Sequence, residues 1–330
     1  MQDNTYAKSA LLELMIKQVR YEGIGIRSYE MVHPEGYELP AFTAGAHIDV
    51  HIPGGFVRQY SLCGDPADAY HYKIAVLRDE HGRGGSQRLH EDFSVGQRVQ
   101  ISQPRNQFPL GGHARKVILL AGGIGITPLM CMVHTLQAQG RNFELHYCAK
   151  DMSHVAFREG MEVLEKTGRA HFHLDGGDPE NGLNIAALLN ALMEDTEIYY
   201  CGPAGFMKAC ANATAHWPKG SVHCEHFKAP EKPLVAGNAE DATPGSFNIQ
   251  IASTGALIAV PADETIVGAL EKAGVHIETS CLSGLCGTCR IRYLAGEVEH
   301  NDYILDDAER AEYLTACVSR AKSELLVLDL

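Results

Sequence analysis

Four of the ten cysteines lie close together near the end of the chain and could bind a metal centre. Cys281, Cys286 and Cys289 follow the spacing Cys-x4-Cys-x2-Cys, and 27 residues separate Cys289 from Cys317. Four thiolates can hold two irons and their bridging sulfides. Zinc also binds four cysteines, but its structural sites more often use two short Cys-x2-Cys pairs. The spacing therefore favours a [2Fe–2S] cluster, with structural zinc as the alternative.

Two glycines lie inside this cysteine loop. Gly284 and Gly287 would let the loop bend around a cluster and turn backbone N–H groups toward the sulfurs. Cys317 can be distant in sequence because it can come from another element. This spacing matches the pattern of plant-type ferredoxins.

A glycine-rich turn before the segment QRLHEDF has the features of a phosphate site. A helix that starts there would expose free N–H groups at the positive end of its dipole, with Ser86 as the expected N-cap. Arg58 could add a charged, two-pronged donor. Each feature alone is also typical of an ordinary turn or strand end. The predicted phosphate site is Arg58, Arg83, Gly84, Gly85 and Ser86.

A second glycine-rich turn, AGGIGITP, follows the apolar strand KVILL. It could hold a dinucleotide on a helix N-terminus, with Thr127 as N-cap and Pro128 as the first helical residue. Cys201-Gly202-Pro203 ends a later strand, EIYY, and carboxyl ends of parallel strands are where ligands bind. The alternative for Cys201 is a buried small apolar residue. The predicted dinucleotide site is Gly122, Gly123, Gly125, Thr127, Pro128, Asp175, Cys201, Gly202 and Pro203.

The elements that must position these residues change in character along the chain. Residues 1–110 contain short alternating runs such as HIDVHI and YKIAVL, which predict an antiparallel β-barrel. Residues 111–228 alternate strands with helices, as in a parallel-sheet α/β domain. Residues 229–245 contain prolines and glycines and predict a linker. Residues 246–330 are expected to form the cysteine-bearing domain.

Composition excludes several classes of function. The chain has 330 residues, 45% of them hydrophobic, and a net charge of −13, which argues against nucleic acid or an anionic membrane as the main partner. No apolar run is long enough to span a bilayer, and no secretory signal is evident. We expect a soluble, cytoplasmic protein that is a monomer of several domains.

Over essentially its whole length and in its domain order, the chain resembles the phthalate dioxygenase reductase and vanillate demethylase reductase family, within the ferredoxin–NADP reductase superfamily. The resemblance implies an FMN-binding barrel, an NAD-binding α/β domain and an α+β β-grasp [2Fe–2S] ferredoxin domain. It places the FMN phosphate on residues 83–86, Tyr60 on the isoalloxazine, Ser61 near its N5, Cys201 beside the nicotinamide and Phe227 closing on the flavin. The remaining implied FMN residues are Gln59, Ala75, Val76, Leu77 and Thr127.

These three modules suit one function, a reductase that takes electrons in pairs from NADH and passes them singly through the cluster. Ser61 and Cys201 are the expected catalytic residues. Lys150 leaves the choice between NADH and NADPH open, although Asp151 and Asp175 would repel a 2′-phosphate.

By resemblance, the electron acceptor is a Rieske non-haem iron oxygenase. Residues 246–330 carry 13 acidic and 6 basic side chains, and we hypothesise that an acidic patch docks on the oxygenase. A solvated surface segment is the alternative. The predicted patch is Asp302, Asp306, Asp307, Glu309 and Glu312.

Two other functions stay open at the sequence level. The first is a reductase that serves a different monooxygenase. The second is a non-enzymatic, zinc-stabilised module that binds nucleotides or senses redox state.

Overall fold

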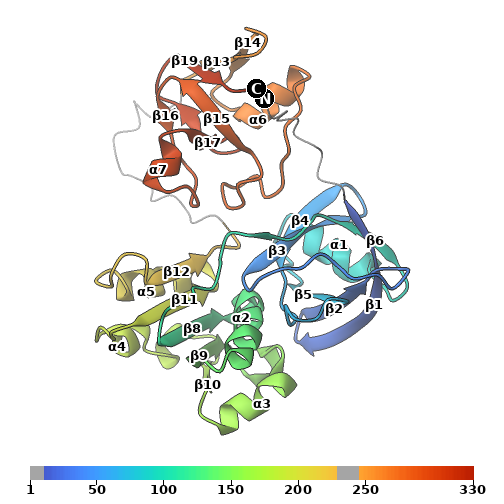
Figure 1. Ribbon diagram of the computed structural model, residues 1–330, viewed down its shortest axis with the longest axis vertical. Helices are drawn as coiled ribbons and strands as arrows, with labels where there is room; N and C mark the ends of the chain where they lie inside the picture. The colour runs from blue at the N-terminus through green and yellow to red at the C-terminus, as the bar shows by residue number, and fades with distance from the viewer. Residues whose placement is uncertain (1–10, 229–244) are drawn as a thin grey trace. The chain divides into compact units, whose positions relative to one another are not determined.

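The structure is a computed structural model that describes residues 11–228 and 245–330 (Figure 1). It contains two compact units, Met1–Phe227 and Lys228–Leu330. Residues 229–244, which make up most of the predicted linker, lie outside the described residues. None of the helices in the described ranges has both the length and the apolar character that crossing a lipid bilayer demands.

The N-terminal part of the first unit is an antiparallel barrel. Its strands follow the order β4-β3-β6-β1-β2-β5, and a bridge between Leu62 and Ile74 joins the end of β4 to β5. Alternate residues of each strand face the interior, so that Leu14, Ile16 and Tyr29 are completely buried. The elements are β1 (Leu12–Gly23), β2 (Ile26–Val32), β3 (Ala46–Ile52), β4 (Phe56–Ser61), β5 (Tyr72–Leu77), α1 (Gly85–Asp92), β6 (Arg98–Ile101) and β7 (Arg105–Asn106), which pairs with β3.

The rest of the first unit is a parallel five-stranded sheet in the order β10-β9-β8-β11-β12. The central strand β8 is buried nearly throughout, as expected for a sheet covered on both faces. The strands are β8 (Lys116–Gly122), β9 (Asn142–Ala149), β10 (Ala170–Leu174), β11 (Thr196–Cys201) and β12 (Val222–Glu225). The helices are α2 (Ile126–Ala138), α3 (Arg158–Lys166), α4 (Ile185–Leu189) and α5 (Ala204–Ala213), with 3₁₀ turns at Gly123–Gly125, Met152–His154 and Pro179–Asn181.

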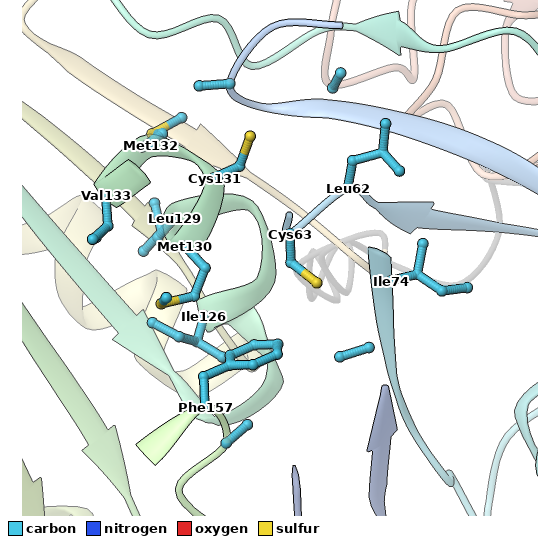
Figure 2. Close-up of a cluster of buried hydrophobic side chains, with 14 of the residues drawn as sticks. Leu62, Cys63, Ile74, Ile126, Leu129, Met130, Cys131, Met132, Val133 and Phe157 are labelled. Atoms are coloured by element: carbon cyan, nitrogen blue, oxygen red, sulfur yellow. The ribbon is translucent and has the colours of Figure 1, made fainter. Parts of the chain in front are cut away.

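One hydrophobic core joins the barrel to this sheet. Figure 2 shows Leu62, Cys63 and Ile74 of the barrel beside Ile126 and Met130 of α2. All five side chains are buried in the same cluster. This shared core fixes the barrel against the sheet and makes the first unit one compact body.

The second unit is a mixed sheet in the order β14-β13-β19-β15-β17, with a small β16-β18 ribbon. Strands β13 and β19 are parallel and the other pairs are antiparallel. Thr265 caps helix α6 by accepting a hydrogen bond from Gly268 N at 3.0 Å. The elements are β13 (Phe247–Ile251), β14 (Leu257–Val260), α6 (Ile266–Lys272), β15 (Arg290–Ala295), β16 (Val298–Glu299), α7 (Asp307–Arg310), β17 (Tyr313–Thr315), β18 (Arg320–Ala321) and β19 (Leu325–Leu328).

The predicted fold class is confirmed: an antiparallel barrel, a parallel-sheet α/β part and an α+β β-grasp unit.

Candidate functional site

The predicted phosphate turn lies at the N-terminus of α1, beside β4. Gly84 is the N-cap and has a positive φ of 78°, which glycine adopts without strain. The Arg58 guanidinium donates hydrogen bonds to the carbonyls of Val57 and Arg83, and it lies 5.2 Å from the centre of the Phe56 ring. Arg58 is therefore fixed at the positive end of this helix.

Two cations meet at this turn without a neutralising carboxylate. Burial lowers the pKa of Arg58, and the nearby charge of Arg83 lowers it further. Among the described residues, neither arginine forms an ion pair with an acidic side chain. Gly85 leaves room for this arrangement, since a Cβ there would lie 2.6 Å from Arg58 Nε. The residues present therefore fit a dianionic phosphate group.

The predicted role of Ser86 as N-cap is wrong. Helix α1 begins two residues earlier than predicted, at Gly85, and its N-cap, Gly84, has no side chain to cap it. The Ser86 hydroxyl instead accepts a hydrogen bond from Asp79 N at 3.0 Å. Ser86 thus holds the preceding loop onto the helix, and the free backbone N–H groups of the first turn stay available.

The other residues assigned to the flavin lie along β4 and β5. Burial raises the pKa of Tyr60, which keeps its hydroxyl neutral. Within the described residues, the buried Nε2 of Gln59 has no hydrogen-bond partner, so it could donate a hydrogen bond to a ligand. In β5, Val76 O contacts His90 Nε2 at 2.9 Å, Ala75 is buried and Leu77 is 40% exposed.

Ser61 lies where the barrel meets the parallel sheet. Its hydroxyl donates a hydrogen bond to Glu225 Oε2 at 3.1 Å, across 164 residues of sequence. Burial raises the pKa of the Glu225 carboxyl to about 7, and the Ser61 hydrogen bond opposes that shift. Glu225 therefore changes charge near neutral pH.

Cys201 lies directly beside Glu225. The two residues are register partners in the parallel pair β11–β12. Cys201 is completely buried, and burial raises its pKa well above the usual range. Its sulfur is a neutral thiol, so it can position a neighbouring group but is poorly suited to act as a nucleophile.

Sequence reasoning missed Glu225. Only Phe227, two residues later, is predicted to contact the flavin, and it is 41% exposed at the end of the first unit. The parallel pairing of β12 with β11 is what places the carboxyl between Ser61 and Cys201. A strand of four residues at a sheet edge carries too little pattern to predict that pairing.

The two turns of the predicted dinucleotide site, at residues 122–125 and 201–203, pack against each other. A Cβ on Gly125 would lie 2.2 Å from Cys201 O, and one on Gly122 would lie 2.9 Å from Pro203 Cδ. A Cβ on Gly202 would lie 3.0 Å from Gly122 Cα. These three glycines are required for turn-to-turn contact. Gly123, at φ 52° with open space around it, is the one that leaves its backbone accessible to a ligand.

The predicted start of the following helix is wrong. The 3₁₀ turn Gly123–Gly125 leads directly into the helix, so that α2 begins at Ile126 with Gly125 as N-cap. Thr127 is the second helical residue, is buried, and donates its hydroxyl hydrogen to Ile124 O at 3.1 Å. Pro128 is consequently the third helical residue, where its missing N–H is still without cost.

Lys150 and Asp175 lie at the carboxyl ends of β9 and β10. Gly176 N donates to Lys150 O at 2.8 Å, and Asp175 Oδ1 accepts from Gly177 N at 2.7 Å. Asp151 accepts hydrogen bonds from Ser153 and His154, which lower its pKa to about 2. Lys150 and Asp175 therefore lie at the same edge of the sheet, at the ends of two neighbouring strands.

The four predicted cluster cysteines converge in the second unit. Hydrogen bonds from the Cys286 and Cys317 thiols lower the pKa of Cys281, and one from Cys317 lowers the pKa of Cys289. Each sulfur is thus within hydrogen-bond reach of at least one other. Within residues 11–228 and 245–330, no group of three or more His, Cys, Asp or Glu side chains has the geometry of a metal-ion site. A [2Fe–2S] cluster needs two ligands at each of two irons.

The cysteine loop provides the donors that a cluster requires. Ser283 N and Leu285 N each lie 3.4 Å from Cys281 Sγ, and Thr288 N lies 3.5 Å from Cys286 Sγ. Gly284 and Gly287 have positive φ values of 70° and 71°. A Cβ on Gly284 would lie 2.7 Å from Val318 Cγ2. The loop therefore fits a [2Fe–2S] cluster, as its sequence predicts.

The predicted acidic patch carries less free charge than its sequence suggests. Asp302 is buried and accepts hydrogen bonds from Ile304 N and Leu305 N. The Glu309 carboxylate pairs with Arg290 at 2.8 Å. Asp306 caps α7, and a further ion pair of 3.4 Å joins Glu312 to Arg292.

Comparison with known proteins agrees with this arrangement of sites. Residues 119–212 match the oxidoreductase NAD-binding domain, and residues 249–322 match the 2Fe-2S iron-sulfur cluster binding domain. The chain is similar to the tert-butanol monooxygenase / tert-amyl alcohol desaturase reductase subunit of Aquincola tertiaricarbonis, with 50% identity over 98% of this chain and 97% of the relative. It is 46% identical to the vanillate O-demethylase oxidoreductase of Pseudomonas sp. (strain HR199 / DSM 7063), and the match covers 97% of this chain and 100% of the relative.

The chain is also similar to a solved structure over nearly its whole length. Phthalate dioxygenase reductase, described as a modular structure for electron transfer from pyridine nucleotides to [2Fe–2S], superimposes with a TM-score of 0.72. The two chains are 38% identical, and the match covers 97% of this chain and 98% of that one.

The fold and the site define an electron-transferring oxidoreductase that uses a pyridine nucleotide, FMN and a [2Fe–2S] cluster. Its relatives are the reductase components of oxygenase systems. The chain belongs to the phthalate dioxygenase reductase and vanillate O-demethylase oxidoreductase family. The predicted family, reductase function and cofactors are confirmed.

Proposed function

We propose that this chain is the NADH-oxidising reductase of a two-component Rieske oxygenase, acting as a monomer in the cytoplasm. The observation that carries the proposal is the contact of Ser61 with Glu225, beside Cys201. It brings the strand assigned to the flavin against the strand ends assigned to the nicotinamide. Hydride transfer needs this kind of close positioning more than it needs an acid–base pair.

The chain's own residues would prepare the reaction in three ways. Arg58, Arg83 and the first turn of α1 would hold the FMN phosphate, and Tyr60 and Gln59 would position the ring. The turns at Gly123 and Cys201 would place the nicotinamide. When bound, FMN converts a two-electron donor into a source of single electrons.

The glutamate supplies charge beside the nicotinamide. The ring becomes cationic as it gives up hydride, and an ionised Glu225 carboxylate would stabilise that charge. Ser61, which holds the carboxylate by a hydrogen bond, would fix its position. Lys150 and Asp175 would bind the adenosine end, where the carboxylate disfavours a 2′-phosphate and supports NADH over NADPH.

We also propose the division into domains at residues 1–110, 111–228, 229–245 and 246–330. The barrel strands lie within residues 12–106, the parallel sheet within 116–225, and the mixed sheet starts at Phe247. These positions support the boundaries.

Reconstitution with an oxygenase tests the proposal. Purified reductase, NADH and a Rieske oxygenase component of the vanillate or phthalate type should give hydroxylated or demethylated product, with NADH oxidation coupled to it. NADPH should support a rate at least roughly tenfold lower. Turnover only with an oxygenase that lacks a Rieske centre would instead favour a reductase of a different monooxygenase.

A further inference from the structure

His90 is a buried histidine of α1 that has no role in the reaction proposed above. Its side chain lies in the interior of the first unit, and its Nε2 is 2.9 Å from Val76 O in β5. A carbonyl oxygen can only accept a hydrogen bond, so Nε2 carries the proton. Burial lowers the pKa of the His90 ring, which is therefore neutral at neutral pH. His90 is thus a neutral hydrogen-bond donor inside the protein.

The main chain of the same residue is held by the neighbouring strand. Arg27 Nη1 in β2 donates a hydrogen bond to His90 O at 2.9 Å. Arg27 and Val76 lie opposite each other in the antiparallel pair β2–β5. Both hydrogen bonds of His90 therefore end on one cross-strand pair, and they fix the last turn of α1 to the β2–β5 sheet at a single point.

Two further contacts join α1 to the chain that follows β5, and both lie nearer the solvent. Ser86 accepts a hydrogen bond from Asp79 N, and the Arg78 guanidinium lies 3.5 Å from the Glu91 carboxylate, with both of these charged side chains exposed. Exposed ion pairs add little stability. Removing one partner of a buried hydrogen bond costs more, because the other partner is left unsatisfied. We therefore expect the His90 bond to be the stiffest link between α1 and β5.

The two elements that His90 joins have different proposed tasks. The first turn of α1 would hold the FMN phosphate, whereas β5 would meet the isoalloxazine. Strand β5 also contacts the 3₁₀ turn Gly123–Gly125 of the dinucleotide site. His90 follows Gly85 by five residues, about 7.5 Å along the helix axis. It therefore acts from the far end of the helix and not on the phosphate itself.

We propose that His90 is a positioning residue that couples the phosphate half of the FMN site to its ring half. The inference rests on the proposed function, because it takes the first turn of α1 as the phosphate site and β5 as part of the ring site. A ligand that fills both halves gains the full affinity only when they are held at a fixed separation. His90 supplies that fixed separation, so that binding of the phosphate also orients the ring for hydride transfer.

Riboflavin, which has the ring of FMN and lacks its phosphate, separates this role from a structural one. His90→Phe keeps a ring at this position and removes the donor. In fluorescence titrations of the flavin-free, full-length variant, FMN affinity should fall roughly tenfold. Riboflavin affinity should stay within about twofold of the unchanged value, because riboflavin fills only one half of the site. His90→Gln, whose amide nitrogen can replace Nε2 as donor, should restore FMN affinity to within about threefold.

His146→Phe is the matched control. His146 and His90 are each 7% exposed, and His146 Nδ1 is hydrogen-bonded to His173 Nε2 at 3.1 Å. His146 lies in β9 of the parallel sheet, outside the proposed flavin site. Its replacement should lower thermal stability and leave both flavin affinities unchanged. A loss of FMN affinity equal to that of His90→Phe would assign the effect to stability and overturn the coupling.

The remaining outcomes separate this inference from the proposed function. Equal losses of FMN and riboflavin affinity in His90→Phe would show a purely structural histidine, and unchanged FMN affinity would show that the two halves are coupled without it. Either result overturns the inference, as does a His90→Gln variant that binds FMN no better than His90→Phe. If the unchanged protein binds riboflavin as tightly as FMN, the proposed phosphate site itself is wrong.

Discussion

At the scale of single residues, Glu225 is the group that we expect to make the site pH-dependent. It is partly buried, bonded to Ser61 and adjacent to Cys201 in the sheet. Since the pKa of the neighbouring Cys201 thiol is raised by burial, that sulfur stays neutral across the physiological range. The charge beside the predicted nicotinamide position is therefore set by one carboxyl whose pKa is about 7.

This predicts the pH profile of flavin reduction. Below pH 7 Glu225 is neutral, and above it the carboxylate can stabilise the positive charge that develops on the nicotinamide. The rate of flavin reduction by NADH should rise roughly tenfold as the pH passes upward through 7. In Glu225→Gln it should stay flat at the lower value. Stopped-flow loss of flavin absorbance measures both.

Stability provides the control for this variant. Folding raises the pKa of the Glu225 carboxyl, so between its usual pKa and 7 the folded protein keeps a proton that the unfolded chain releases. The folded protein therefore loses stability as the pH rises through this interval. Glu225→Gln removes this cost. It should therefore gain thermal stability over the unchanged protein at pH 8 but not at pH 4, and an equal difference at both values would contradict the assigned pKa.

At the scale of elements, the first turn of α1 and the strand β4 form the unit that we propose binds the FMN phosphate. Arg58 reaches from the strand to the Arg83 carbonyl at the helix start, and Gly85 is the residue that leaves space for it. The helix itself adds the dipole and free N–H groups. We therefore expect phosphate binding to need both elements.

Gly85→Ala should therefore weaken FMN binding. The added methyl group would lie 2.6 Å from Arg58 Nε and displace the guanidinium, although the helical backbone itself accepts alanine. We expect FMN affinity to fall at least roughly tenfold, as measured by fluorescence titration of the flavin-free protein.

Gly160→Ala is the matched control, because this glycine lies within α3 with open space around its Cβ position. It should leave FMN affinity unchanged and add roughly 0.5–1 kcal/mol of stability. Equal losses of FMN in both variants would mean that the effect comes from the fold and not from Arg58.

How well the sequence predicts a feature depends on how far apart its interacting residues lie along the chain. The cysteine loop is predictable because its ligands and glycines fall within a few residues, and Thr265 caps α6 as a local signal should. A hydroxyl near a helix start predicts an N-cap, but Ser86 and Thr127 do not cap their helices, because Gly84 and Gly125 hold the N-cap positions. The bond between Ser61 and Glu225 spans 164 residues, so no local pattern could reveal it.

At the scale of the whole molecule, the chain consists of two units with separate hydrophobic cores. The first core joins the barrel to the parallel sheet, and the second is built around β13, β19 and α6. Cys289 and Cys317 belong to the second core. Loss of the cluster should thus destabilise the second unit and leave the stability of the first unit unchanged.

Cys286→Ser tests this modularity. The variant should fail to assemble the cluster and should lose nearly all electron transfer to the oxygenase. Flavin reduction by NADH should stay within about twofold of the unchanged rate, because the residues that we propose hold FMN and the nucleotide belong to the first unit. Electron paramagnetic resonance and stopped-flow absorbance follow the two centres separately, and joint loss of both would contradict independent units.

The most direct measurement is an anaerobic titration of the purified protein with NADH, combined with iron, sulfide and FMN analysis. The account predicts two irons, two sulfides and one FMN per chain, and a visible spectrum that bleaches as about three electrons are taken up. A colourless protein, bound zinc in place of iron, or a cluster that NADH leaves oxidised would contradict it.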